Sequence, residues 1–197
     1  MTPAHPGPRA GAARRVAGVV AGGAALGGML ALSGCGFVGD GERRAAAQPG
    51  SLTVSSPAFR DGQTVPARYT CHGEGVNPAL RWSGLPAATR AIAVVVDDPD
   101  APSGPYVHWV LFNIDPHNTE IAEDSLPSGA DEAAASNGKA KYAPPCPPGG
   151  ETHHYRFSVY ALDARLPLRD DTALTTTLRT IPQHVIARGR LTGIVRG

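Results

Sequence analysis

Short apolar runs closed by glycine or proline recur along this chain and restrict the fold that it can adopt. Residues 91–96 read A-I-A-V-V-V, a run whose β-branched members favour extended backbone. Six further runs have the same character: residues 52–55, 67–69, 80–82, 108–114, 155–162 and 191–195. They do not alternate with helical patterns, so the sequence predicts a mainly β fold with antiparallel strands.

Two stretches near the C-terminal end predict short helices. An acidic pair ending at Asp171 stands before residues 172–179, as capping residues do at a helix start. Proline is tolerated in a first helical turn, so Pro182 is compatible with a second helical stretch over residues 180–188. The polar segment 116–152 is long for a loop in a compact domain, and such loops are usually functional or mobile.

The first 34 residues have the layout of a bacterial lipoprotein signal peptide. Arg9, Arg14 and Arg15 form a basic region, and residues 16–32 are apolar and uncharged. The segment ends in L-S-G-C, the lipobox pattern in which Cys35 becomes the lipidated N-terminus of the mature protein. Two alternatives are a transmembrane anchor, which needs about 20 apolar residues, and export by the twin-arginine route.

Three parts of the chain follow from this layout. We expect a signal peptide over residues 1–34, a lipidated flexible tether over residues 35–50, and one folded domain over residues 51–197. The mature protein would then be anchored by lipid to the extracytoplasmic face of the cell membrane. The formal net charge is +1 and the domain has no Lys/Arg cluster, so nothing predicts nucleic acid as a partner.

The remaining cysteines are an even pair in a compartment that favours oxidation. Of three cysteines, Cys35 would carry lipid, which leaves Cys71 and Cys146. We predict a disulfide between them, since exported proteins commonly oxidise such pairs. The alternative is two separate buried thiols.

Polar residues follow two of the strand-like runs, in segments stiffened by proline. Residues 91–96 lead into D-D-P-D-A-P, which contains Asp98, Asp100 and Pro102, and H-W follows at His108. Proline fixes the backbone φ angle and lowers the entropy lost when a loop is held in one shape. Such strand ends are suited to a small polar pocket.

The second polar segment is Y-A-P-P-C-P-P-G-G-E-T-H-H-Y, residues 142–155. It contains Pro144, His153 and Tyr155. Strand alternation should turn His154 away from the side on which its two neighbours lie. We also expect at least one cis peptide bond in the proline-rich loops, at Pro102 or in the later proline cluster.

The order of these motifs resembles the phosphatidylethanolamine-binding protein family, and most of all its bacterial Raf-kinase-inhibitor-like branch. D-P-D-A-P, H-W, Y-x-x-P-C-P-P-G and H-x-Y occur in the family's order, within a similarity from about residue 52 to residue 193. Y-T-C, L-R-W and V-Y-A-L-D also match. Two departures are Pro144, where the family usually has glycine, and Ala135, where it usually has asparagine.

The resemblance implies a fold and a site. The fold is a large central antiparallel sheet with a smaller sheet and a few short helices. The site is an anion pocket at one end of the sheet, with residues 144–148 as one wall. Its ligand-binding residues would be Asp98, His108, Pro144, His153 and Tyr155, supported by Asp100, Pro102 and Trp109.

The residue types fit such a pocket. A phosphate oxygen accepts hydrogen bonds from imidazole, hydroxyl and backbone N–H groups. Asp98 would orient a histidine and keep it cationic. Each residue also has a structural alternative: Asp98 and Asp100 could be turn residues, His108 a buried core histidine, and Tyr155 a packing residue with a solvated hydroxyl.

We therefore predict a domain that binds a small phosphate- or carboxylate-bearing ligand, or a partner group that presents one, without a cofactor and without a metal. A role as an inhibitor-like regulator is implied only by the family's naming. The alternative is an enzyme that uses Asp/His/Tyr acid–base chemistry on a small polar substrate. A metal site built from Asp98, Asp100, His108 and His153 is also conceivable by residue type, but no H-x-x-x-H spacing supports it.

Overall fold

The structure, a computed structural model, describes residues 48–197. The predicted signal peptide, the lipidated Cys35 and nearly all of the tether lie outside these residues, so they stay predictions. Among residues 48–197, no helix is both long enough and apolar enough to cross a bilayer.

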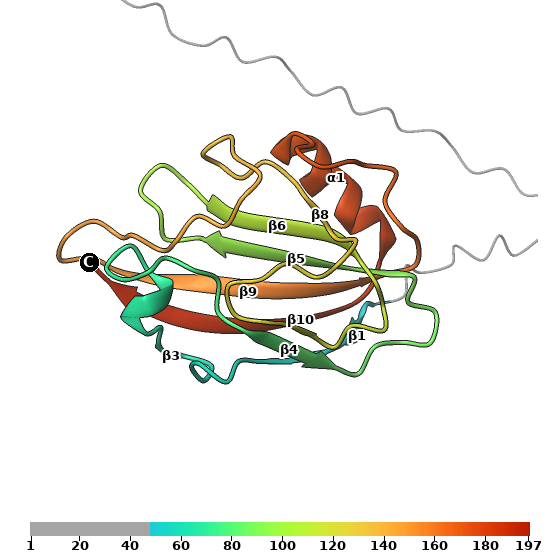
Figure 1. The fold of residues 1–197 in the computed structure, drawn as a ribbon, viewed down its shortest axis with the longest axis horizontal. Helices are drawn as coiled ribbons and strands as arrows, with labels where there is room; N and C mark the ends of the chain where they lie inside the picture. Colours follow the sequence, from blue (N-terminus) through green and yellow to red (C-terminus); the bar gives the residue numbers. More distant parts are fainter. Residues whose placement is uncertain (1–47) are drawn as a thin grey trace, which may run out of the picture. The chain divides into compact units, whose positions relative to one another are not determined.

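The domain is built around a seven-stranded sheet with four long neighbouring strands at its centre (Figure 1). β5 (Ala91–Asp98) lies between β6 (Tyr106–Ile114) and β9 (Thr152–Leu162) and is antiparallel to both. β10 (Val185–Arg196) continues the sheet beyond β9 and is antiparallel to it. The longer apolar runs of the sequence fall within these four strands.

Short strands complete the two sheets. β8 (Asp131–Glu132) pairs with β6, whereas β1 (Gly50–Ser51) and β3 (Gln63–Thr64) pair with β10 in parallel. The large sheet is therefore mixed, where we predicted an antiparallel one, because two short N-terminal strands run in the same direction as β10. The smaller sheet has the order β2 (Thr53–Ser55), β4 (Leu80–Ser83) and β7 (Glu120–Ile121).

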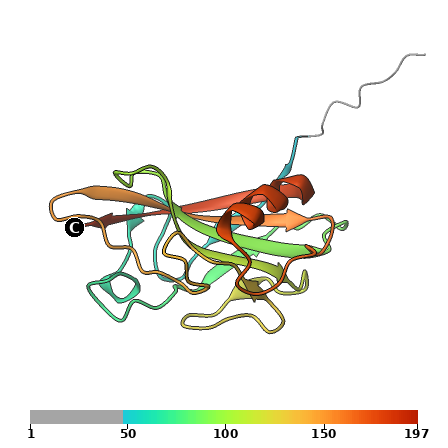
Figure 2. The ribbon, with the colours of Figure 1, turned by 90° about the horizontal axis from the view of Figure 1, so that it is seen from above.

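Both faces of the large sheet are buried in its central part. In β5, Ile92 and Val94 belong to one hydrophobic cluster, and Ala93 and Val95 belong to another, as expected from strand alternation. The first cluster includes Trp82 of the smaller sheet. The second is covered by the C-terminal helix, which lies along the large sheet in Figure 2. The near-continuous apolar run of β5 is thus explained by burial on both sides.

The helical prediction near the C-terminal end is wrong in part. One helix, α1 (Leu174–His184), replaces the two predicted stretches, and Pro182 lies in its last turn. Residues from Val185 onward form a strand, because their backbone pairs with β9, Ala187 with Ala161. Pairing in the sheet overrides the local preference that predicted a helix through residue 188.

The short run Ala67–Tyr69, predicted as a strand, is a 3₁₀ helix (η1). It follows Pro66, which has no backbone N–H to contribute to a sheet. Both the backbone N–H and the hydroxyl of Thr70 donate to the carbonyl oxygen of Ala67, at 3.0 and 2.9 Å. These bonds close the chain into a turn.

Two glycines of β10 let the N-terminal segment pack closely against this strand. A Cβ atom on Gly189 would overlap the carbonyl oxygen of Leu52. A Cβ atom on Gly193 would overlap the side chain of Val65 and come within 2.9 Å of the Phe59 ring. The aromatic and aliphatic side chains of the N-terminal segment therefore reach the core only because β10 has no side chain at these positions.

Candidate functional site

The ends of three neighbouring strands bring the predicted residues together. β5 ends at Asp98, β6 begins at Tyr106 and β9 begins at Thr152. Because both neighbours are antiparallel to β5, the C-terminal end of β5 and the N-terminal ends of β6 and β9 lie together at one end of the sheet. A cavity of about 300 Å³ lies there, lined among others by Asp98, Pro102, His108, Pro144, His153 and Tyr155.

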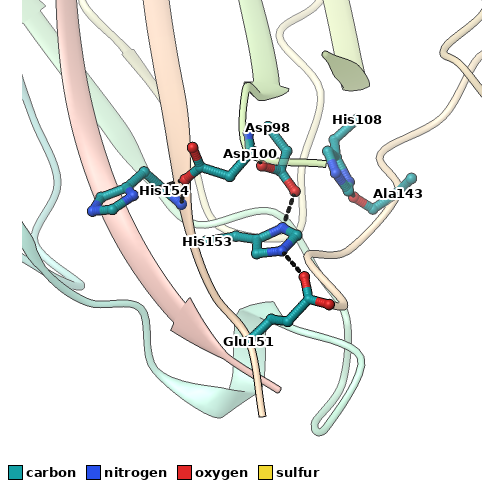
Figure 3. Close-up of polar contacts among 7 residues, drawn as sticks. All are labelled: Asp98, Asp100, His108, Ala143, Glu151, His153 and His154. Carbon is teal, nitrogen blue, oxygen red and sulfur yellow. Dashed lines mark hydrogen bonds and ion pairs between the residues drawn. The ribbon is translucent and has the colours of Figure 1, made fainter. Parts of the chain in front are cut away.

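His153 lies between two carboxylates. Its Nδ1 is 2.7 Å from Oδ2 of Asp98, and its Nε2 is 2.8 Å from Oε2 of Glu151 (Figure 3). Only 3% of His153 is exposed. The hydrogen bond to Asp98, and next the one to Glu151, raise the pKa of His153 above its ordinary value, because both favour the imidazolium form.

Asp98 uses its two oxygens for different contacts. Oδ1 accepts the backbone N–H of Asp100 at 2.9 Å, which fixes the turn after β5, while Oδ2 faces His153. The sequence left open whether Asp98 was a turn residue or a partner of a histidine, and the structure has both contacts. The turn thereby holds the carboxylate toward β9.

A β-bulge explains how His108 reaches the cavity. Val96 of β5 is paired with Trp109 and Asp97 with Val107, so His108 is an extra residue on β6. Its ring lies 5.2 Å from the Tyr155 ring, edge to face, and its Nδ1 is 2.9 Å from the carbonyl oxygen of Ala143. Burial lowers the pKa of His108, which favours the neutral ring.

Tyr155 lies on β9, two residues beyond His153, and faces the same side of the sheet. Its ring is 6.4 Å from the His153 ring in a stacked arrangement, and only 1% of the residue is exposed. Burial first, and then the negative charge of Asp98, raise the pKa of its hydroxyl. The hydroxyl therefore keeps its proton.

The proline-rich wall of the cavity is tied to η1 by a disulfide. Cys71 and Cys146 are bonded, with their Cα atoms 5.4 Å apart. The backbone N–H of Cys71 also donates to the carbonyl oxygen of Pro145 at 3.0 Å. Every peptide bond among the described residues is trans, so the prediction of a cis bond at Pro102 or in residues 144–148 is wrong. Here the disulfide and backbone hydrogen bonds hold the loop with all bonds trans.

Two of the predicted supporting residues contribute from outside the centre of the site. Oδ2 of Asp100 accepts the backbone N–H of His154 at 2.8 Å and lies 2.7 Å from its Nδ1. This pair connects the turn after β5 to β9, with His154 directed away from His153, as strand alternation predicted (Figure 3). Trp109 does not line the cavity; its indole N–H donates to Glu132 at 2.6 Å on another part of the surface.

Sequence reasoning missed two residues of the site. Tyr106 lines the cavity, with its ring 4.7 Å from that of His108. Glu151, the residue before β9, contacts His153 after a turn at Gly149 and Gly150. No apolar run or motif marks either residue, although an acid two residues before a strand histidine lies on the same face and is a usable signal.

With two carboxylates and one imidazolium, the ionised side chains at the cavity carry a net negative charge while Glu151 is in place. Asp98 and Glu151 contribute carboxylates, and His153 contributes the imidazolium between them. The side chain of Glu151 is 48% exposed, in contrast to 4% for that of Asp98, so Glu151 is the partner that can move away. Among residues 48–197, no three or more His, Cys, Asp and Glu side chains are grouped as metal ligands.

Comparison of this chain with known proteins identifies its family. The family model described as phosphatidylethanolamine-binding protein matches residues 55–196. A UPF0098 protein of Methanothermobacter thermautotrophicus is 38% identical over 150 residues, covering 74% of this chain and 99% of the relative. LppC of Mycobacterium tuberculosis, a protein named as a candidate lipoprotein, is 37% identical over 187 residues, covering 86% of this chain and 92% of the relative.

A solved structure agrees with the sequence comparison. The crystal structure of CT736 from Chlamydia trachomatis, described as a homologue of phosphatidylethanolamine-binding proteins, superposes with a TM-score of 0.70 at 31% identity. The match covers 75% of this chain and 98% of CT736. The fold, the order of the motifs and the matched length lead to one conclusion: this chain belongs to the phosphatidylethanolamine-binding protein family.

Proposed function

We propose that this protein is anchored by lipid outside the cytoplasm and binds a small ligand bearing a phosphate or carboxylate group in the cavity around His153. The observation that carries the proposal is the contact of the Glu151 carboxylate with Nε2 of His153 at 2.8 Å. A carboxylate oxygen of the chain itself occupies the place that a ligand oxygen would take. The position thus suits an anionic acceptor by distance and by charge.

The surroundings of this nitrogen support a small ligand. The cavity of about 300 Å³ lies at the lower end of the range of ligand pockets, and its walls include Pro102, Pro144 and Pro148. The Tyr155 hydroxyl keeps its proton, and His153 is held cationic by Asp98. One charged donor beside an apolar wall matches a headgroup with a single anionic end.

The lipid anchor rests on the lipobox at Cys35 and on the relative LppC, whose name classes it as a candidate lipoprotein. A protein exposed outside the cytoplasm has no access to cytosolic kinases. The proposed ligand is therefore a small molecule or headgroup of the extracytoplasmic space rather than a kinase.

An acid–base enzyme is the second candidate, and the Asp98–His153 pair favours it. A buried carboxylate at 2.7 Å that raises the pKa of an imidazole is the arrangement of a general acid–base pair. The two candidates are separated by incubating the protein with a bound ligand. Release of a product that depends on His153 would favour the enzyme, and recovery of the intact ligand would favour the binding protein.

Calorimetry with residues 48–197 tests the binding proposal. All residues of both hydrophobic clusters lie between Leu52 and Val195, and CT736 consists almost entirely of the matching domain, so we expect this part to fold on its own. We expect inorganic phosphate to bind, and we expect phosphorylethanolamine, a phosphomonoester whose second pKa is about 6, to bind most tightly between about pH 5.5 and 7, where imidazolium and a doubly charged phosphate group coexist. Comparison of the affinities for phosphate, phosphorylethanolamine and acetate then shows which class of ligand the cavity prefers.

Matched variants make this test specific. His153→Ala and Asp98→Asn should weaken phosphate binding by about tenfold or more, because a charge-assisted hydrogen bond is lost. His117→Ala is the control, since His117 is a histidine with a 93% exposed side chain that is paired with Asp115 away from the cavity. Unchanged affinity in both cavity variants would remove the support for this pocket.

A further inference from the structure

A second cavity lies on the other face of the large sheet, where α1 leaves part of the sheet uncovered. It has a volume of about 570 Å³ and lies between α1 and strands β5, β9 and β10. Apolar side chains form most of its lining, among them Val95, Tyr160, Leu174 and Leu178. Leu178 is 36% exposed, so one side of this groove presents a large apolar side chain to solvent.

Three arginines line this groove, one from β9 and two from β10. Arg156 is neutralised by an ion pair with Asp97. Arg188 and Arg190 are exposed, and no carboxylate among residues 48–197 forms an ion pair with either. The only side-chain hydrogen bond of the described residues that involves these two arginines is a long one, 3.4 Å, from Nε of Arg190 to Ser158. Two positive charges beside an apolar groove are therefore available to an anionic, amphipathic partner.

The N-terminal segment approaches the domain at the same groove. Pro49 contributes to the lining, and β1, which follows it, pairs with β10 through Gly50 and Ala187 (Figure 1). The predicted lipidated cysteine, Cys35, is only 14 residues before Pro49 in the sequence. Such a short tether keeps the attached surface of a domain near the bilayer to which the lipid belongs.

We propose that the groove between α1 and β10 is a membrane-contact surface, in which Arg188 and Arg190 bind the phosphates of anionic phospholipids and Leu178 enters the apolar boundary of the bilayer. The positive charges of Arg188 and Arg190 favour an anionic lipid over a neutral one. The short tether between Cys35 and Pro49 favours the membrane over a partner in solution. This surface is separate from the cavity around His153, which opens on the other face of the sheet.

Vesicle co-sedimentation of residues 48–197 tests the proposal without the lipid anchor, so its outcome does not depend on Cys35. We expect binding to vesicles of phosphatidylglycerol in phosphatidylcholine and little binding to phosphatidylcholine alone. Binding should weaken as salt is raised, because the headgroup charge is screened. Arg188→Glu with Arg190→Glu should lower the partition coefficient by about tenfold or more, since each arginine near an anionic surface contributes about 1 kcal/mol.

Each variant has a matched control. Arg60→Glu with Arg196→Glu changes the net charge by the same amount on a part of the chain that does not line the groove. Leu178→Ser should lower vesicle binding severalfold, whereas Leu126→Ser, at a 51% exposed leucine that does not line the groove, should not. Circular dichroism checks the fold, and Arg188→Gln with Arg190→Gln provides the same comparison if charge reversal prevents folding.

Three outcomes would overturn the proposal. The first is an absence of binding to anionic vesicles. The second is an equal loss of binding in the groove variant and in its charge-matched control, which would indicate a general charge effect. The third is a concentration-dependent dimer that uses Leu178 in place of vesicle binding, because the groove would then be covered by a second copy.

Discussion

At the scale of single residues, the site depends on how many protons one imidazole carries. A neutral imidazole has one N–H, but His153 faces a carboxylate at each ring nitrogen, at 2.7 and 2.8 Å. Both contacts are hydrogen bonds only in the imidazolium form. Asp98 and Glu151 therefore act together to keep His153 charged, which explains the direction of its pKa shift.

We expect Asp98→Asn to lower the pKa of His153. The neutral amide removes the larger of the two interactions that favour imidazolium. NMR titration of the ring protons measures the pKa directly. Asp115→Asn, which alters the exposed pair with His117, is the control and should leave His153 unchanged. A His153 pKa that is equal in wild type and Asp98→Asn would contradict the proposed role of Asp98.

The same shift predicts how stability depends on pH. The folded-state pKa of His153 is raised above the unfolded value of about 6.5, so its stabilising contribution is complete below that pH. It is lost as pH rises through the folded-state pKa. The difference in unfolding free energy between wild type and His153→Gln should therefore shrink on going from mildly acidic to alkaline buffer in urea titrations.

We expect Glu151→Gln to increase phosphate affinity by about two- to fivefold. The variant removes a competing carboxylate, and a half-exposed ion pair contributes up to about 1 kcal/mol. Calorimetry against wild type measures the change. Glu120→Gln, which disrupts an exposed pair with Arg81 in the smaller sheet, should have no effect. A lower affinity in Glu151→Gln would show that Glu151 helps to hold the ligand instead of competing with it.

At the scale of elements, the cavity is held by connections between segments that are far apart in the sequence. The disulfide joins the η1 region to the proline-rich wall across a sequence separation of 75 residues. The turn after β5 is connected to β9 through Asp100. The wall and the strand ends are thus separately fixed.

Replacing Cys71 and Cys146 by serine should lower the unfolding free energy by about 4 kcal/mol in the chain-entropy account of a loop of this length. It should also weaken phosphate binding, because the wall carrying Pro144 becomes mobile. Urea unfolding and calorimetry give the two numbers. A reducing agent should destabilise wild type but leave the double variant unchanged, and equal stability of the two proteins would contradict the prediction.

Gly193→Ala should destabilise the domain by about 1–3 kcal/mol, because the added methyl group overlaps the side chains of Val65 and Phe59. Gly149→Ala is the matched control: a Cβ atom at Gly149 has no neighbour within 4 Å, so little change is expected. Thermal or urea unfolding separates the two. Equal stability of both variants would show that the segment around Val65 adjusts without cost.

The elements that could be predicted from the sequence are those with a strong local pattern. The apolar run of β5 ends in carboxylates and Pro99 and needs no tertiary information. The start of β10 could not be predicted, because Val185 and Ala187 follow helical residues and become a strand only by pairing with β9. Likewise, the bulge at His108 depends on the register of β5 against β6, which no single-strand pattern contains.

The residues of the site could be predicted mostly through the family resemblance. Asp98 and His153 are 55 residues apart, and nothing in their spacing alone shows that they meet. Glu151 was missed because it follows a glycine turn between two motifs and belongs to neither. Its role depends on where that turn directs the chain.

At the scale of the whole molecule, the two proposed surfaces lie on opposite faces of one sheet. Tyr155 of β9 belongs to the face with the His153 cavity, and Tyr160 of the same strand belongs to the face covered by α1. A domain held at the membrane by the second face would leave the first open to ligands. Anchoring and ligand binding would then not interfere with each other.

Lipidation at Cys35 is the prediction that determines the cellular location of the protein. Cys35→Ala should block cleavage by the lipoprotein signal peptidase, and the precursor should keep residues 1–34. Mass spectrometry of the mature wild-type protein should find a diacylglycerol on Cys35. Cys71→Ser serves as a control, since it alters a cysteine outside the lipobox. A wild-type protein that begins at another residue would contradict the prediction.

The backbone at Gly197 has a practical consequence for the measurements on the His153 cavity. Its N–H donates to the carbonyl oxygen of Glu151 at 2.9 Å, and a Cβ atom there would overlap the carbonyl oxygen of Pro148. Any purification tag fused after Gly197 would begin against the turn that carries Glu151. A polyhistidine tag would add imidazoles beside the one being titrated and could displace the carboxylate under study. Recombinant protein for these assays should carry its tag ahead of Gln48, with a protease site for removal.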